Sequence, residues 1–320
     1  MFDRRPQSGE TSGNVLRIEK TSMYDGAGLR TVVFLKGCPL QCLWCSTPES
    51  QSPRTQVGYN REKCTLCGLC VAACTAKARR LEAEGARITR DGNRCTSYLT
   101  CIRTCPNSAV KGYGMYMTVR DVLREIEKDE VFYFHSGGGV TISGGEPLEQ
   151  ARFVEELLRG CQTLGIHRAL ETSFFSPWKR IERILPYLSL LYVDLKHTDP
   201  AAHRRVTGVD NDTIMDNIKR ADSSEYDFEM IVRIPVIPEI NDADSTLKNA
   251  ARFIKSLDRV KSVELLAYHR LGTETYRNLE MEYKLPDLAS PSQDLMLKKA
   301  RLVRDVSGTS VIVDGKPVED

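Results

Sequence analysis

The sequence predicts an α/β protein, built as an open, partial barrel of parallel strands with a cysteine-rich segment inserted near its N-terminal end. Short, β-branched apolar runs alternate with longer helical patterns along most of the 320 residues. Six such strand–helix units are too few to close an eight-stranded barrel. Residues 54–112 interrupt the first unit with seven cysteines, so the predicted domains are 14–53, 54–112 and 113–320.

The expected strands are nearly continuous apolar runs, as is typical of parallel strands buried on both faces. Thr118 followed by Asp121 has the pattern of a capping box that opens the first helix. Strand–helix alternation predicts right-handed βαβ units around one sheet. The predicted strands are 31–35, 140–143, 168–172, 190–195, 228–234 and 262–267, with a last run at 310–313. The predicted helices are 119–128, 148–164, 176–184, 212–221, 243–257 and 292–306.

Composition excludes several classes of protein. With 41% hydrophobic and 28% charged residues, the chain is ordinary for a globular protein. No apolar run approaches the roughly 20 residues of a membrane-spanning helix, and residues 1–10 lack an apolar signal core. The net charge of +2 gives no general case for nucleic-acid binding. We therefore expect a cytoplasmic monomer with neither a membrane nor a nucleic acid as partner.

Cysteine is the informative residue type. Ten of the 11 cysteines fall between Cys38 and Cys105, and only Cys161 lies outside. Thiols stay reduced in the cytosol, so clustered cysteines there more often bind metal than form disulfides. We expect Cys161, in a predicted helix, to be an ordinary core residue.

The first cysteine group is Cys38, Cys42 and Cys45, a C-x3-C-x2-C run directly after a predicted strand. Three thiolates at this spacing can hold three irons of a cubane cluster, which leaves the fourth iron open to a substrate or cofactor. Zinc is the alternative, but it would want a fourth Cys or His nearby. The next ten residues contain neither.

Charged and small residues follow the ends of the later strands, where barrel active sites form. The glycine turn Gly144-Gly145-Glu146 follows the second strand and allows close approach of a ligand to the backbone. One charged residue at a strand end is usually just a solvated loop residue, but four successive ends with such groups favour a site. These groups are Glu171, Asp194 with Lys196, Arg233 and His269.

These motifs resemble those of the radical S-adenosylmethionine (SAM) superfamily. Its signature is C-x3-C-x-aromatic-C, with Trp44 in the aromatic position, and the stretch 143–147 is similar to the GGEP motif. The resemblance implies that the open iron of a 4Fe-4S cluster chelates SAM and that one electron cleaves it to a 5′-deoxyadenosyl radical. It also implies that Gly144, Gly145 and Glu146 hold the SAM amino group.

The resemblance extends to the activating enzymes of glycyl-radical enzymes, over about residues 14–280. Asp25-Gly26-Ala27-Gly28-Leu29-Arg30-Thr31 is similar to their D-G-P-G-x-R-T element, and Asp-Leu-Lys-His at 194–197 and Tyr-His-Arg-Leu-Gly at 268–272 match in order. Such enzymes abstract hydrogen from a glycine of a partner glycyl-radical enzyme, with electrons from a flavodoxin or ferredoxin.

This family resemblance also implies roles for single residues. Cys38, Cys42, Cys45 and Asp25 would be catalytic, with Asp25 facing the partner's glycine loop. Trp44, Glu171, Asp194, Lys196, Arg233 and His269 would contact SAM, and Thr172 and the Tyr192 carbonyl would help Glu171 and Asp194 hold a monovalent cation. Three departures stand out: Ala27 replaces proline, Thr47 follows Ser46 where relatives have His-Asn, and Glu239 replaces a glycine.

The inserted segment resembles a bacterial two-cluster ferredoxin. In such proteins the fourth cysteine of each run ligates the other run's cluster. One complete site would therefore use Cys64, Cys67, Cys70 and Cys105. The second would use Cys74, Cys95 and Cys101, with Tyr98 at the missing cysteine position. That site could hold a 3Fe-4S cluster, a 4Fe-4S cluster with a non-cysteine or open ligand, or nothing.

The charge of the insertion has two interpretations. Residues 54–112 carry a formal +7, and the rest of the chain −5. The cations either offset negative clusters or form a docking face for an acidic electron donor.

Two other functions fit parts of the sequence. A ferredoxin-like electron carrier would not need the strand-end Asp, Lys, Arg and His. A radical SAM enzyme acting on a small molecule would be expected to add a substrate domain, and none follows the barrel up to Asp320. The insertion is shared by activating enzymes of several reaction classes, so it selects no single partner.

Overall fold

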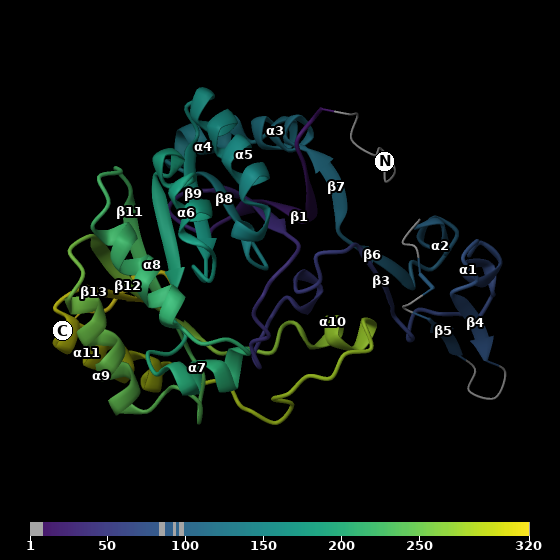
Figure 1. The fold of residues 1–320 in the computed structure, drawn as a ribbon. Coiled ribbons are helices and arrows are strands. Elements are labelled where there is room, and N and C mark those ends of the chain that lie inside the picture. The colour runs from purple at the N-terminus through teal and green to yellow at the C-terminus, as the bar shows by residue number, and fades with distance from the viewer. Residues whose placement is uncertain (1–8, 83–86, 92–93, 96–98, 320) are drawn as a thin grey trace.

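The computed structural model describes residues 9–82, 87–91, 94–95 and 99–319. Its main element is a sheet in which seven parallel strands follow one another in chain order. This confirms the open, partial barrel (Figure 1). The parallel strands are β2 (Arg30–Leu35), β8 (Gly139–Gly144), β9 (His167–Thr172), β10 (Leu190–Asp194), β11 (Glu229–Val236), β12 (Val260–Ala267) and β13 (Ser310–Val313).

Both edges of this sheet carry strands that the sequence patterns did not predict. At one edge, β1 (Ser12–Ser22) pairs antiparallel with β2, and β7 (Met115–Thr118) pairs antiparallel with β1. At the other edge, β14 (Lys316–Pro317) pairs antiparallel with β13. β1 was missed because its outer half is polar and exposed, which hides its apolar half in the pattern.

Helices follow the strands largely as expected. The capping box is confirmed: the Asp121 amide donates to Thr118 Oγ1 over 3.1 Å. Missed elements are α4 and the two helices beside the cavity, α7 and α10. The helices of the barrel are α3 (Val119–Glu127), α4 (Glu130–Ser136), α5 (Ala151–Thr163), α6 (Trp178–Glu182), α7 (Pro200–Thr207), α8 (Asp212–Asp222), α9 (Asp244–Lys255), α10 (Thr273–Asn278) and α11 (Gln293–Ser307), with short 3-10 turns η1 (Pro48–Ser50), η2 (Pro147–Gln150) and η3 (Leu185–Tyr187).

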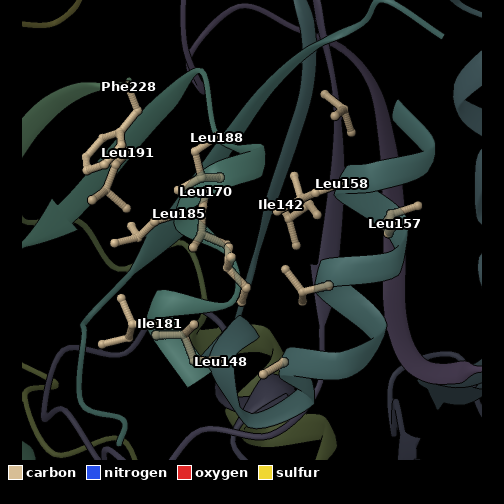
Figure 2. Packing of buried hydrophobic residues seen from close by; sticks show 14 of the residues in the cluster. Ile142, Leu148, Leu157, Leu158, Leu170, Ile181, Leu185, Leu188, Leu191 and Phe228 are labelled. Carbon is tan, nitrogen blue, oxygen red and sulfur yellow. The ribbon is translucent and has the colours of Figure 1, made fainter. Parts of the chain in front are cut away.

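The two faces of the parallel sheet differ in chemistry. Outward residues such as Ile142, Leu170 and Leu191 are buried against helices, and Leu157 and Leu158 of α5 meet them (Figure 2). Burial of each such side chain contributes roughly 1.5–3 kcal/mol. The expectation that both faces of the sheet carry apolar residues is wrong for the inward face. The inward face carries Thr141, Glu171, Tyr192, Asp194, Arg233 and Glu264, which lie on matching rows of adjacent strands.

Residues 56–113 form a lobe to one side of the barrel (Figure 1). β3 (Gln56–Tyr59) pairs with β6 (Val110–Tyr113), and β4 (Arg79–Glu82) pairs with β5 (Arg87–Arg90). The lobe also contains the short helices α1 (Leu69–Ala72) and α2 (Thr100–Arg103). It has its own small core, and α10 contacts both this lobe and η1 of the barrel. None of the described helices is long and apolar enough to cross a membrane.

Candidate active site

The loop that carries Cys38, Cys42 and Cys45 leaves the end of β2 and is tied down on both sides. The Gly37 and Cys38 amides donate to the Ser50 and Gln51 carbonyls over 2.7 and 3.0 Å. On the other side, the amides of Gln41 and Leu43 donate to carbonyls at the C-terminal end of α7. All three cysteines line one cavity of about 240 Å³.

The glycine turn at the end of β8 has a steric cause. Gly144 has φ +128°, and a Cβ there would lie 2.2 Å from the Leu35 nitrogen. A Cβ on Gly145 would lie 2.4 Å from the Gly37 carbonyl oxygen. Both glycines therefore let β8 pack against the cysteine loop, and both also line the cavity.

The family resemblance implies that Glu146 contacts SAM. In the structure, however, Glu146 is fully buried and does not line the cavity. Its carboxylate accepts from Thr172 Oγ1 and Ser173 Oγ, each over 2.6 Å, and from the amides of Ser173 and Leu148. Burial raises its pKa, and these donors oppose that rise. Glu146 thus joins the end of β8 to the end of β9 and holds the glycine turn in place.

Asp194 and Lys196 form an ion pair on the cavity wall. Lys196 Nζ donates to Asp194 Oδ2 over 2.7 Å, and the lysine side chain is largely buried. Burial acts against the charged lysine, but Asp194 and the nearby Cys42 outweigh it, so that the pKa of Lys196 lies above its ordinary value. The cavity therefore holds a fixed positive charge beside the cysteines.

Glu171 lines the same cavity and links to a second pair. Ser143 Oγ donates to Glu171 Oε2 over 2.6 Å, and the Arg233 guanidinium bonds to Glu171 Oε1. Arg233 also donates to Glu264 Oε2 over 2.6 Å. Burial opposes the Arg233 charge, but the two glutamates outweigh it and raise the pKa of Arg233. Arg233 itself does not line the cavity.

Glu264 was missed by the sequence reasoning. It lies opposite Arg233 in the register of β11 and β12. The signal was available: a single acidic residue in the middle of an apolar strand run needs a buried partner.

Asp25 lies near the other end of the barrel interior and does not line the cavity. Its backbone carbonyl accepts from Thr141 Oγ1 over 2.8 Å, and its carboxylate accepts from Ser22 Oγ. The fully buried Arg30 side chain closes this region by donating to Thr141 Oγ1 and to the Val140 carbonyl.

The segment after β12 covers the cysteine loop. Tyr268 and His269 line the cavity together with Trp44. A Cβ on Gly272 would lie 2.3 Å from the Ser46 carbonyl oxygen, so the two loops touch there. Tyr276 of α10 donates to the Cys45 carbonyl over 3.2 Å.

Most of the predicted barrel residues thus converge on one cavity, and four do not: Asp25, Glu146, Tyr192 and Arg233. The cavity-lining set from the sequence analysis is Cys38, Cys42, Trp44, Cys45, Gly144, Gly145, Glu171, Thr172, Asp194, Lys196 and His269. Glu239, at a position where the family resemblance implies a glycine, has φ +64°, a backbone conformation that glycine favours.

The donor set fits an iron–sulfur cluster with an open iron. Three thiols line the cavity, and among the described residues His269 is the one other cysteine or histidine that lines it. Burial raises the pKa of Cys42 to about 12, so iron must displace a proton to bind there. Among the described residues no three His, Cys, Asp or Glu groups converge on a single-ion site. A cubane attaches its cysteines to different irons and needs no such convergence.

Five of the insertion's seven cysteines share a small core, namely Cys64, Cys70, Cys95, Cys101 and Cys105. Cys70 and Cys101 are buried in it, while Cys67 is exposed. Cys70 has Cys105, Cys101 and Cys64 as electrostatic neighbours, and the Ala78 amide donates to the Cys74 sulfur over 3.2 Å. Tyr98 lies outside the described residues.

Comparison with known proteins agrees with this geometry. Residues 95–253 match the model of the radical SAM superfamily, and residues 56–106 match that of a 4Fe-4S dicluster domain. The chain is 40% identical to the (2S)-3-sulfopropanediol dehydratase activating enzyme of Klebsiella oxytoca, over 86% of this chain and 88% of the relative.

The chain belongs to the activating enzymes of glycyl-radical enzymes. This activating enzyme is also 40% identical to the isethionate sulfite-lyase activating enzyme of Oleidesulfovibrio alaskensis, over 89% of this chain and 92% of the relative. It is 38% identical to the trans-4-hydroxy-L-proline dehydratase activating enzyme of Clostridioides difficile, over 90% and 93%. The activating enzyme is thus a radical SAM enzyme with iron–sulfur clusters.

Proposed function

We propose that this activating enzyme binds a 4Fe-4S cluster through Cys38, Cys42 and Cys45 and holds SAM in the adjoining cavity. The observation that carries the proposal is that these three cysteines share one cavity with Glu171, Asp194, Lys196 and His269. When bound, the cluster supplies the electron that cleaves SAM, and the resulting radical removes hydrogen from a glycine of the partner glycyl-radical enzyme.

The charged side chains of the cavity complement SAM. Asp194 and Glu171 offer carboxylates to its ammonium, sulfonium and ribose, and Lys196 offers a positive charge to its carboxylate. We assign Trp44, Gly144, Gly145 and His269 to the walls of this site. Glu146 and Arg233 act as positioning residues, because each bonds to groups that line the cavity rather than lining it. A monovalent cation at Glu171 and Asp194 stays a prediction.

The insertion is assigned two auxiliary clusters. Cys64, Cys67, Cys70 and Cys105 would hold the first, a 4Fe-4S cluster. Cys74, Cys95 and Cys101 would hold the second, either 3Fe-4S or 4Fe-4S. We propose the units 14–53, 54–112 and 113–320, with residues 54–112 relaying electrons. The contact of α10 with both the insertion and η1 supports this role, as does the hydrogen bond from Tyr276 to Cys45.

The proposed partners are a glycyl-radical enzyme, whose glycine loop faces Asp25, and a flavodoxin or ferredoxin donor. We place the protein in the cytoplasm as a monomer. None of the eleven cysteines, all of which lie in the described residues, forms a disulfide, and this supports a reducing compartment.

The test is anaerobic incubation with SAM and dithionite, followed by assay for 5′-deoxyadenosine. Cleavage is expected in the reconstituted protein. A ferredoxin-like carrier would take up electrons without forming 5′-deoxyadenosine, and that outcome would contradict the proposal. Adding a glycyl-radical enzyme should give the glycyl radical signal in electron paramagnetic resonance. An enzyme acting on a small molecule would cleave SAM but leave every such partner unmodified.

A further inference from the structure

Arg79 is an unusual residue in the insertion. It opens β4, its side chain is 3% exposed, and both terminal guanidinium nitrogens lack a hydrogen-bond partner within the described residues. An ionised group buried without a partner costs several kcal/mol. The placement is therefore unfavourable unless an anion lies against the guanidinium.

Among the described residues, no carboxylate is hydrogen-bonded to either terminal nitrogen of Arg79. β4 pairs with β5 so that Arg79 lies opposite Arg90, and like charges in such positions destabilise a pair of strands. β4 also packs against α1, which carries the buried Cys70. Among the charged groups that act on the Cys70 thiol, Arg79 has the largest effect, and it lowers the pKa of that thiol.

A second donor lies beside another cysteine of the same proposed site. The Tyr59 hydroxyl, at the end of β3, is buried and makes no hydrogen bond within the described residues. Tyr59 packs in the same small core as Cys64. A phenol hydroxyl in this place can donate a hydrogen bond to a sulfur of the cluster that Cys64 would hold.

We propose that Arg79 and Tyr59 donate to the sulfurs of the cluster held by Cys64, Cys67, Cys70 and Cys105 and raise its reduction potential. This inference rests on the proposed function of those four cysteines. Reduction adds one negative charge to a cluster that four thiolates already make about doubly negative. A buried positive charge and hydrogen bonds to sulfur both stabilise the reduced form. The first auxiliary cluster thus becomes the preferred entry point for an electron arriving at the insertion.

The experiment is a redox titration of the full-length, reconstituted protein followed by electron paramagnetic resonance. The signal that disappears in Cys67→Ala identifies the first auxiliary cluster. Arg79→Met should shift its reduction equilibrium at least tenfold toward the oxidised form, which is 59 mV for one electron. Arg80→Met is the matched control, because Arg80 is the next residue of β4 and is exposed. It should leave the midpoint unchanged.

Two further variants keep the inference open to refutation. Arg79→Lys keeps the charge and should recover at least half of the shift. Tyr59→Phe should move the midpoint in the same direction by less. An Arg79→Met midpoint equal to that of Arg80→Met overturns the inference. If Arg79→Met loses its cluster, Arg79→Lys decides: a cluster with a nearly wild-type midpoint supports the role, and a lost cluster refutes it. Unchanged iron and signals in Cys67→Ala would instead refute the cluster assignment.

Discussion

The two cysteine groups of this activating enzyme differ in what surrounds them. The barrel cysteines line a cavity shared with two carboxylates, a lysine and a histidine. Five of the seven cysteines of the insertion pack with Val57, Ile88 and Val110 in a small core, and Cys67 is exposed. An open cavity beside three thiols leaves room for a ligand at the metal, whereas a small packed core suits a cluster that only exchanges electrons. The environment of the cysteines therefore distinguishes the two proposed roles.

Removing one cysteine from each group should separate these purposes most sharply. Cys42→Ala should lower reductive SAM cleavage at least a thousandfold, about 4 kcal/mol in barrier height. Cys67→Ala should keep dithionite-driven cleavage within about twofold, because dithionite can reduce the barrel cluster directly. Each variant should lose about four irons per chain. The measurements are 5′-deoxyadenosine yield and iron content.

Cys161→Ala is the matched control, because Cys161 is buried in α5 away from both groups. It should change neither yield nor iron. Undiminished cleavage in Cys42→Ala would mean that the barrel site is assigned wrongly.

Ligand binding should depend on the barrel cavity alone. Asp194→Ala and His269→Ala should each weaken SAM binding about tenfold to a hundredfold, which is about 1.4–2.8 kcal/mol, because each removes a polar wall of the cavity. Iron content should stay unchanged, since neither residue is among the proposed ligands. Equilibrium dialysis with SAM and an iron assay measure the two quantities. Asp216→Ala, on the exposed face of α8, serves as control. Loss of iron in both site variants would make them structural residues instead.

The loss of folding stability at mildly acidic pH should also arise in the barrel, because residues 54–112 contain no histidine. His167 accepts a hydrogen bond from the buried Arg30 over 3.2 Å. Burial, with Arg30 and Arg168 adding to it, lowers the pKa of His167 from 6.5 to about 4. Since the unfolded state then binds the proton better, stability falls as the pH falls from 6.5 toward 4.

Between pH 7.5 and 5.5 this difference should cost about 1 kcal/mol of unfolding free energy. His167→Asn removes the titrating group and should lose less stability over the same interval. Chemical denaturation of both proteins at the two pH values measures the difference. Equal losses in wild type and variant would show that another group is responsible.

The smallest effect concerns backbone strain at Glu239. A side chain at φ +64° is strained relative to glycine, but glycine also gains entropy in the unfolded chain. Glu239→Gly should therefore stabilise the protein by about 0.5 kcal/mol. Glu282→Gly, at an exposed position without positive φ, should destabilise it. Thermal unfolding compares the two, and a lower midpoint for Glu239→Gly would contradict the expectation.

The sequence by itself determined the order of the parallel strands and most of the residues that line the barrel cavity. Apolar runs predict buried strands because every backbone group of such a run must pair in a sheet. The spacing of Cys38, Cys42 and Cys45 is a local property, since one short loop carries all three. Strand-end residues such as Asp194 and His269 were found because parallel strands end on the same side of a barrel.

Only the tertiary structure decided which polar residues face the cavity and which hold others in place. Glu146 and Arg233 bond to side chains that lie more than 25 residues away in the chain. No local sequence pattern therefore shows that Thr172 and Ser173 donate to Glu146. The same holds for the bonds of Arg233 to Glu171 and Glu264. The short helix α10 is stabilised by packing near the cysteine loop rather than by its own periodicity. The short helix α7 has a local signal, the N-cap Asp199, and its last carbonyls also accept hydrogen bonds from the cysteine loop. In the sequence, nothing distinguishes Arg79 from the other cations of the basic segment 54–112. Its burial against α1 is visible only in three dimensions, because strand pairing and helix packing determine which side of β4 faces inward.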